Sequence, residues 1–363
     1  MNKEVISDRH AIFTMTLFIW GSSIIIGTGG EAKKDVWLAI MVAMIMGILI
    51  SVMYSRILEL YPEKNVFEVN EVVFGKILGK IISLMYVWFA FHLSALVINN
   101  FSEFISIVGL PDTPRVVPVI FLTVLCIWAV KEGIEVIGRL SAPFSIFLQI
   151  LIITTTSLSI KEMKLDNLRP LLFEGLRPVI KGAISSFTFP FAETVIFLMI
   201  FSGLKNKKSA YKVFPIAMLV TGLSLIVLAA RNVMIIGAEE LSRNYFPSYT
   251  VVSRIDIGQF IQRIETAVMV AFLMAGFVKV SCCILAVCNG IAKILNFDDY
   301  RFLVTPVALA SLSFSYIVYH SIIETVKWVP QVWYAYALIF QVGLPLVTYI
   351  GAEIKAKSSS KSK

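Results

Sequence analysis

Charged residues are scarce in this sequence of 363 residues. Lys, Arg, Asp and Glu together make up 15% of the chain, whereas about a quarter of the residues in a typical soluble domain are charged. Hydrophobic residues make up 58%. A water-soluble fold of this size could not cover its surface with so few charges. The composition therefore excludes an ordinary soluble domain and predicts a protein of the lipid bilayer.

Metal-binding and catalytic patterns are also missing. The sequence has only three histidines and contains no P-loop, HExxH or GxSxG motif. The spacing of the cysteines fits no zinc site, and a disulfide framework is not expected at this length. All four lie inside apolar segments: Cys126, Cys282, Cys283 and Cys288. We therefore predict neither an enzyme nor a cofactor or metal site.

Long apolar runs, by contrast, follow one another along the whole chain. A spanning helix needs about 20 mostly apolar residues. Ten segments come close to this length or exceed it: 10–29, 36–56, 81–106, 115–131, 140–159, 181–202, 212–230, 263–289, 302–319 and 331–351. We predict an all-α membrane protein with about ten transmembrane helices in a single domain, residues 1–354, followed by a basic tail, residues 355–363. The N-terminus lacks a signal-peptide cleavage pattern, so we expect the first helix to direct insertion.

Three segments outside the spans have a character of their own. Residues 66–79 are short and mixed in polarity, which is typical of an amphipathic helix at the membrane interface. Two loops are long, 160–180 and 231–262. The second contains aromatic and apolar residues, so we expect it to be partly folded at the membrane surface.

Basic residues lie between the spans rather than on one soluble face, although the net charge is +8. This distribution argues against a nucleic-acid partner and favours a role in membrane orientation. The short loop 203–212 carries four lysines, whereas 109–114 carries none. Because ten spans put both termini on the same side, we predict that both termini are cytoplasmic.

The first span contains residues that weaken a helix. From Trp20 to Gly30 it reads WGSSIIIGTGG, and each glycine in a helix interior costs about 1 kcal/mol relative to alanine. One interpretation is close helix packing through small residues. The other is an unwound stretch whose free backbone groups line a binding cavity, because non-helical backbone at membrane depth is tolerated only in such places.

The sixth span has a comparable interruption, SSFTFPFAETVIF, at residues 185–197. Pro190 lacks a backbone donor and clashes with the preceding turn, which by itself predicts a kink. Glu193 follows three residues later, and an ionisable residue inside a span indicates a functional site. The proline, the carboxylate and the neighbouring hydroxyl residues together favour a discontinuous helix.

The two interruptions fall in the first and sixth of ten spans. This arrangement is expected of two five-helix inverted repeats with breaks in corresponding positions, here about 10–159 and 181–351. In such a fold the ligand lies at the membrane midplane between the broken helices. Half-helix N-termini can hold a carboxylate, and unwound carbonyls can hold an ammonium group.

The third span carries a polar stripe of His92, Asn99 and Glu103, which fall within roughly 40° of one another on a helix. A ligand-binding stripe and an internal packing network are both consistent with this spacing. A lone histidine such as His92 is more often a hydrogen-bonded interior residue than a ligand. We predict Asn99 as the ligand-binding residue of this span and assign His92 and Glu103 structural or coupling roles.

The eighth span carries Lys279. A lysine at membrane depth is costly unless it is paired or hydrated. Glu265 lies 14 residues earlier, about 21 Å along a helix, and is too far away to be its partner. We expect Lys279 to pair with Glu193 or with unwound carbonyls of the first span.

These patterns resemble a known family. The stretch GSSIIIGTG is similar to the glycine-rich first helix of the amino acid–polyamine–organocation superfamily, which has a LeuT-like 5+5 inverted repeat. More narrowly, the chain resembles the B subunit of nutrient germinant receptors in spore-forming bacteria. The resemblance covers its length, its ten spans and the motifs ISDRHAIFTM, FPFAET, RIE (Arg263 to Glu265) and FVKVS. One departure is Ala192, where the family pattern has glycine.

The resemblance implies a ligand site at backbone-rich positions of the two broken helices. The matching positions are Gly21, Ser22, Gly27, Thr28, Gly29, Thr188, Phe189, Ala192 and Glu193. It also implies that Lys279 lies where sodium-coupled members hold an ion, so sodium coupling is not expected. The implied partners are a small nutrient, often an amino acid, an A subunit and a C-subunit lipoprotein in the spore inner membrane.

Three functions remain open on the sequence. The first is a nutrient-sensing receptor subunit that signals germination. The second is a secondary transporter of amino acids or polyamines, which robust uptake by the purified protein would favour. The third is a scaffold subunit that binds no ligand, and it predicts unchanged ligand specificity after mutation of both broken helices.

Overall fold

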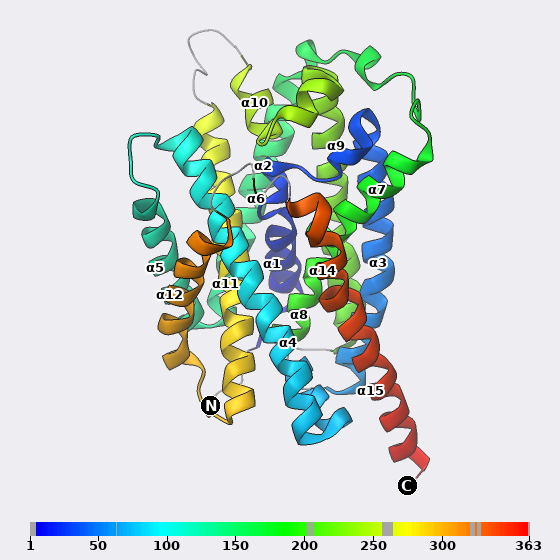
Figure 1. The fold of residues 1–363 in the computed structure, drawn as a ribbon, viewed down its shortest axis with the longest axis vertical. Helices are drawn as coiled ribbons and strands as arrows, with labels where there is room; N and C mark the ends of the chain where they lie inside the picture. Colours follow the sequence, from blue (N-terminus) through cyan, green and yellow to red (C-terminus); the bar gives the residue numbers. More distant parts are fainter. Residues whose placement is uncertain are drawn as a thin grey trace.

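The computed structural model describes residues 5–62, 64–201, 204, 207–255, 264–319, 324 and 328–361. Most of these residues form helices that run along the long axis of the molecule (Figure 1). The α-helices are α1 (Asp8–Trp20), α2 (Ser23–Ile26), α3 (Val36–Leu60), α4 (Val66–Phe104), α5 (Val116–Glu132), α6 (Ile134–Leu158), α7 (Leu176–Ser186), α8 (Phe197–Ile200), α9 (Ala210–Arg243), α10 (Pro247–Ser253), α11 (Ile264–Leu295), α12 (Arg301–Val318), α14 (Tyr334–Leu338) and α15 (Leu344–Lys361).

Short 3-10 and π-helical segments join or interrupt these helices. The 3-10 segments are η1 (Gly30–Asp35), η3 (Ile160–Glu162), η4 (Leu165–Leu168), η6 (Ala192–Ile196) and η8 (Lys207–Ser209). The π-helical segments are η2 (Ile105–Gly109), η5 (Phe187–Phe191), η9 (Val329–Trp333) and η10 (Ile339–Gly343).

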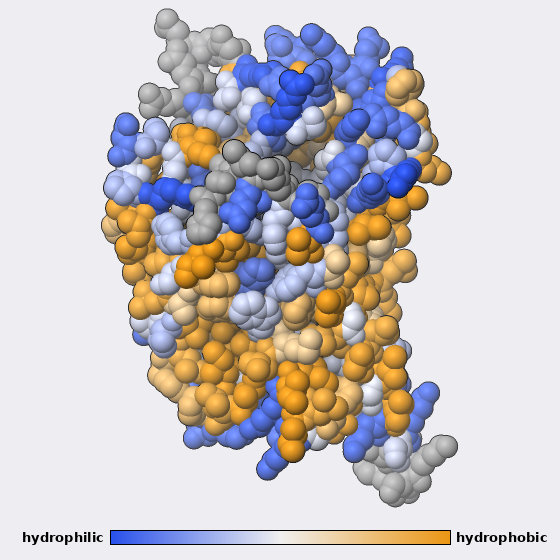
Figure 2. Space-filling view, in the orientation of Figure 1, coloured by the Kyte–Doolittle hydropathy of each residue, from blue (hydrophilic) through white to orange (hydrophobic). Residues whose placement is uncertain are grey.

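Within the described residues, eight helices are long and apolar enough to cross a membrane. The broken pair α1–α2 and the 17-residue α5 lie in the same bundle. Figure 2 shows a hydrophobic surface over the middle and lower parts of the molecule, with hydrophilic residues gathered at both ends. The prediction of an all-α membrane protein with about ten transmembrane helices is confirmed.

Two long helices change direction at a glycine. In α4, Gly75 has φ 77° and separates the segment that begins at Val66 from the long span that follows. In α9, Gly237 has φ 75°. Both values lie in the left-handed region that favours glycine. Gly75 thus separates residues 66–74 of the segment expected at the membrane interface, 66–79, from the long span, and residues 76–79 continue into that span.

The long connection after the seventh span is folded, as predicted, as far as Ile255. There α9 continues to Arg243 and α10 follows. The rest of the predicted loop, together with Arg263 of the RIE triplet, lies outside the described residues. The same holds for residues 1–4 and 362–363 of the predicted termini. Helix α15 runs on into the predicted tail as far as Lys361.

Helix α1 lies at the centre of the bundle (Figure 1) and packs against α6, α9 and α11. Its start is capped by the Ser7 hydroxyl, which accepts a hydrogen bond from the backbone N–H of His10. Every residue from Thr14 to Trp20 is buried. The first broken helix is therefore surrounded by protein on all sides, where unwound backbone can be tolerated.

Candidate functional site

The first span is interrupted twice. Helix α1 ends at Trp20, and α2 is a single turn that ends at Ile26, where the C-cap residue Gly27 has φ 78° and ψ 177°. Gly29 follows with φ 72°. Residues other than glycine rarely adopt these backbone conformations. The glycines predicted to unwind this span do so.

The sixth span is interrupted once, by a different means. Helix α7 gives way to the π-helical segment η5, then to the 3-10 segment η6, before α8 begins. Phe189 has φ −142° and ψ 107°, which is extended rather than helical. The next residue, Pro190, has no backbone N–H and therefore cannot donate the hydrogen bond that would continue the helix. The predicted discontinuous helix is present here as well.

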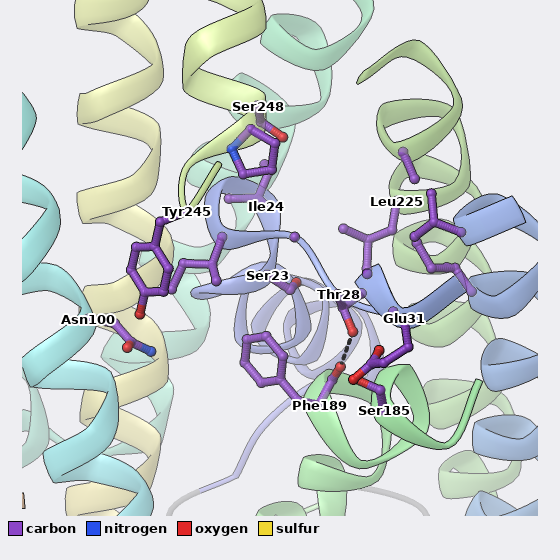
Figure 3. A pocket seen from close by; sticks show the side chains of 18 of the residues that line it. Ser23, Ile24, Thr28, Glu31, Asn100, Ser185, Phe189, Leu225, Tyr245 and Ser248 are labelled. Atoms are coloured by element: carbon purple, nitrogen blue, oxygen red, sulfur yellow. Dashed lines mark hydrogen bonds between the residues drawn. The ribbon is translucent and has the colours of Figure 1, made fainter. Parts of the chain in front are cut away.

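The two breaks pack against each other. The Thr28 hydroxyl donates a hydrogen bond to the carbonyl oxygen of Phe189 at 2.7 Å (Figure 3) and lies 3.0 Å from the Ser186 hydroxyl. A Cβ atom added at Gly29 would lie 2.5 Å from Ser186 Oγ and 3.2 Å from the carbonyl oxygen of Gly182. Only a glycine lets the chains approach this closely.

A buried ion pair supports the second break. Lys279 Nζ lies 2.5 Å from Glu193 Oε2, and both side chains are fully buried. The ammonium group also lies 5.2 Å and 5.1 Å from the ring centroids of Phe18 and Phe189, within the range of cation–π attraction. A Cβ atom at Gly21 would lie 2.4 Å from Lys279 Cδ. The structure thus selects Glu193 from the two partners considered for Lys279, and Gly21 leaves room for the lysine stem.

A cavity of about 400 Å³ lies between the two breaks, and this volume suits a small molecule. Five of the predicted ligand-binding residues line it: Gly27, Thr28, Gly29, Phe189 and Glu193. It extends toward α10, at the end of the molecule opposite both termini (Figure 1), where Asn244, Tyr245 and Ser248 line it. Glu193 contributes Oε1, a buried atom that has no hydrogen-bond partner among the described residues.

Four other predicted positions on the two broken helices do not line the cavity: Gly21, Ser22, Thr188 and Ala192. Ser22 Oγ accepts a hydrogen bond from Asn100 Nδ2 at 3.3 Å. The Thr188 hydroxyl lies 3.1 Å from the carbonyl oxygens of both Ile184 and Ser185, within its own helix. Pro190 is likewise buried and does not line the cavity.

The polar stripe of the third span does not face this cavity, which corrects the position expected for Asn99. Its amide donates to the carbonyl oxygen of Ser315 on α12 at 3.0 Å. His92 Nδ1 lies 2.9 Å from the Tyr336 hydroxyl and its ring stacks on Trp88. A neighbouring face of α4 lines the cavity instead. It consists of Leu93, Leu96, Val97 and Asn100.

Glu103 also lies off the cavity, and it is 2% exposed. Its neighbour Tyr245, in the connection between α9 and α10, does line the cavity. Burial raises the pKa of the Tyr245 hydroxyl well above its usual range, and the nearby Glu103 carboxylate raises this pKa further. Tyr245 therefore stays a neutral hydrogen-bonding group at the cavity wall.

Sequence reasoning missed several lining residues, of which Glu31 is the most polar. Glu31 lies in η1, directly after the Gly29–Gly30 pair. The Tyr334 hydroxyl donates a hydrogen bond to its Oε1 atom and lies 2.8 Å from the Ser185 hydroxyl. The position of an acidic residue immediately beyond the glycine-rich break was a signal that could have found it.

Among the described residues, no group of three or more His, Cys, Asp and Glu side chains is arranged to hold a metal ion. All four cysteines are buried and free. The polar groups of the two broken helices that line the cavity are backbone atoms, hydroxyls and the carboxylates of Glu31 and Glu193. Such groups can bind a small polar molecule through hydrogen bonds and charge.

The sequence matches the family described as "Spore germination protein" over residues 5–322. Spore germination protein KB of Bacillus subtilis is 29% identical over 367 residues, which cover 100% of this chain and 98% of that protein. The putative spore germination protein YfkT of Bacillus subtilis is 25% identical over 338 residues, which cover 92% and 91%. Spore germination protein YndE of the same organism is 23% identical and is matched over 73% of both chains.

Two solved structures share the fold. Mhp1, a nucleobase-cation-symport-1 family transporter with bromovinylhydantoin bound, has a TM-score of 0.67, with 93% of this chain and 76% of that chain covered. MhsT in complex with L-phenylalanine has a TM-score of 0.66, with 98% and 99% covered. Both are 12% identical in sequence, so the likeness concerns the fold alone. It supports the LeuT-like architecture that the positions of the two breaks predict.

Proposed function

Because this chain belongs to the spore germination protein family, we propose that it is the nutrient-sensing subunit of a spore germinant receptor. A small nutrient, most simply an amino acid, binds at the midplane between the broken helices and triggers germination. Each five-helix half, about 10–159 and 181–351, contributes one broken helix to the site.

One observation carries this proposal: the cavity of about 400 Å³ lies where both helices are unwound. Gly27 and Thr28 border it from one break, and Phe189 and Glu193 border it from the other. Unwound backbone at membrane depth is tolerated where it lines such a cavity. Its free N–H and C=O groups can recognise a polar ligand without a dedicated side chain.

The receptor works by shifting a conformational equilibrium. A ligand that contacts both breaks binds more tightly to whichever arrangement of α1–α2 and α7–α8 fits it best, and it favours that arrangement by the difference in affinity. The partner subunits, an A subunit and a C-subunit lipoprotein, respond to the favoured arrangement. The complex lies in the spore inner membrane, with both termini of this chain on the cytoplasmic side.

The test uses spores that carry Glu193→Gln or Gly27→Leu, screened against single amino acids and sugars. Receptor abundance is measured by immunoblot in the same spores. We expect a lost or altered nutrient response at normal abundance. An unchanged response would show that the nutrient does not bind in this cavity, and a scaffold role would remain for the chain.

A secondary amino acid or polyamine transporter is the alternative, and the shared fold with two transporters favours it. Lys279 places a tethered cation between α1 and the second break, so a sodium ion is not needed to balance Glu193. Uptake of radiolabelled amino acids into liposomes that contain the purified chain distinguishes the two functions. Sustained uptake against a gradient would support the transporter, and binding without uptake supports the receptor.

A further inference from the structure

The connection between α6 and α7 exposes a run of apolar side chains. Leu171 is 53% exposed, Leu172 40% and Phe173 73%, and Leu176 at the start of α7 is 62% exposed. We call these four residues the apolar patch. Consecutive exposed apolar side chains are unusual on a loop that meets water, and they indicate a surface that lipid or another molecule covers.

The apolar patch lies directly before a segment that can cross the membrane. The stretch Leu176–Ile200 is long and apolar enough to do so, and it begins with the last residue of the patch. Ile180 and Ile184 follow Leu176 at intervals of four residues, which places all three on one face of α7, and all three are exposed. The apolar patch is therefore continuous with an exposed apolar face of the sixth span.

The surface beside this face is apolar as well. Helix α7 packs against α3, where Val42 and Ile45 are exposed. The connection runs along the outer edge of the bundle, at the end opposite both termini (Figure 1). Figure 2 shows hydrophobic residues at this edge that continue into the hydrophobic surface below. Because the apolar patch joins a surface that faces lipid, the bilayer is the partner that it fits.

Basic side chains flank the apolar patch. Arg169 precedes it, and Arg177 and Lys181 follow it on α7. All three are exposed, and among the described residues none of them forms an ion pair. Residues 160–181 contain five basic and three acidic residues. Apolar side chains with exposed cations beside them are typical of segments in the headgroup region, where the apolar groups meet the acyl chains and the cations attract anionic lipids.

The apolar patch is also tied to the chain that follows the first break. The backbone N–H of Leu172 donates to both carboxylate oxygens of Asp35, each at 3.2 Å, and Asp35 is 4% exposed. Asp35 ends the 3-10 segment η1, whose Glu31 lines the cavity. Two contacts at the surface join the same segments: Lys33 with Glu174 at 2.6 Å, and Lys34 Nζ with the ring centroid of Phe173 at 4.8 Å.

We propose that the apolar patch is a membrane anchor, inserted into the headgroup region of the leaflet opposite both termini. Arg169 and Arg177 bind anionic phospholipid there, and the anchor holds η1 in place at the cavity wall. The patch lies outside the cavity, so this inference does not depend on the ligand that the cavity binds.

The first test measures the depth of the apolar patch in the full chain, reconstituted in lipid nanodiscs. All four native cysteines are buried, so the variant Phe173→Cys can be labelled selectively with the environment-sensitive fluorophore NBD. We expect phospholipids with a doxyl group near the headgroup to quench this probe strongly, and aqueous iodide to quench it weakly. Glu162→Cys, at an exposed position earlier in the same connection, is the matched control and should show the reverse.

The second test measures selectivity for anionic lipid. Quenching of the probe at position 173 by doxyl-labelled phosphatidylglycerol is compared with quenching by doxyl-labelled phosphatidylcholine at equal mole fractions. We expect the binding constant of phosphatidylglycerol relative to phosphatidylcholine to fall about fivefold in each of the variants Arg169→Gln and Arg177→Gln. Lys131→Gln, which removes an exposed cation at the end of the molecule that carries the termini, should leave it unchanged.

The third test concerns η1. The double variant Leu171→Ser/Phe173→Ser should speed amide hydrogen exchange in Gly30–Asp35 several-fold, because the segment loses its anchored neighbour. Ile160→Ser removes an apolar side chain that is 62% exposed at the far end of the same connection, and it should leave the exchange unchanged.

Each result decides one part of the inference. Iodide quenching at position 173 as strong as at position 162 would overturn insertion into the bilayer. Exposure to iodide in the chain alone, with protection only in the assembled receptor, would assign the apolar patch to a partner protein and overturn the lipid assignment. Equal quenching by the two lipids would overturn the role of the arginines. Unchanged exchange in the double variant would overturn the link to η1.

Discussion

The two broken helices open the same cavity by different physical means. The first break depends mainly on backbone conformation: Gly27 and Gly29 take φ values near +75°, and among the described residues no ion pair involves the residues from Gly27 to Gly29. The second break has extended backbone at Phe189, and an ion pair between Glu193 and Lys279 holds it to a neighbouring helix. The first is sensitive to the size of a side chain, and the second is sensitive to charge.

This difference separates two ways in which a membrane protein can keep a helix unwound. Glycine removes the steric obstacle to an unusual conformation. A paired charge instead makes the unwound arrangement more favourable than any arrangement that leaves the charge alone in a low-dielectric interior. Substitutions matched in size or in charge therefore distinguish the two breaks.

The largest effect is expected at the ion pair. Lys279→Met should destabilise the chain by about 3–5 kcal/mol, because it leaves Glu193 buried without its partner. The measurement is Tm and the yield of folded protein in nanodiscs. The double variant Lys279→Met/Glu193→Gln should recover much of this loss, since no buried charge remains. Normal Tm and normal ligand response in Lys279→Met alone would contradict the role of charge at the second break.

A somewhat smaller effect is expected at the glycines of the first break. Gly29→Ala combines left-handed backbone with a Cβ only 2.5 Å from Ser186 Oγ, and it should cost about 2–4 kcal/mol. Gly30→Ala is the matched control: its φ is not positive, and a Cβ there would meet no atom of the described residues within 4 Å. Equal Tm values for the two variants would show that steric freedom does not maintain this break.

The contact between the breaks should contribute less. Thr28→Val removes the hydroxyl that donates to the Phe189 carbonyl and keeps the volume of the side chain. We expect a loss of about 1 kcal/mol in stability. Thr28→Ser, which keeps the donor, should lie close to wild type. The quantity compared is Tm of the purified chain, and a Val variant as stable as the Ser variant would mean that the two breaks are independent.

The smallest effect concerns helix α4. Asn100→Ala should change the ligand response, because Asn100 lines the cavity and donates to Ser22. Asn99→Ala should leave the response unchanged and lower Tm slightly, because Asn99 does not line the cavity and, among the described residues, its side chain bonds only to the Ser315 carbonyl on α12. Germination rates at matched receptor abundance test this pair. The reverse result would show that α4 faces the site with its other side.

The fold could be predicted because its determinants are local. Apolar runs identify the spans, and glycine or proline identifies the breaks, since each acts through its own backbone. Glu193 is one of the two partners that the sequence predicts for Lys279, because a buried lysine needs a counter-charge. None of these inferences requires knowledge of how the helices are rotated.

A single sequence does not show how each helix is rotated about its axis or where each helix gives way to a connection. Asn99 and Asn100 differ by about 100° around α4, and only the packing of α4 against α11 and α12 decides which one faces the cavity. The apolar run predicts that the seventh span ends at residue 230, whereas α9 runs to Arg243. Glu31 lies just beyond the predicted end of the first span, so its approach to Tyr334 depends on contacts over 303 positions of sequence.

The fit of Lys279 against Gly21 and Glu193 also has an evolutionary consequence. Three helices meet at this point, and a change at any one of the three positions either strands a charge or forces a side chain into occupied space. A lineage that replaces the lysine must also replace the glutamate, and a larger residue at position 21 becomes possible only after the lysine is gone. We therefore expect these three positions to change together among relatives, with the lysine lost before position 21 becomes larger.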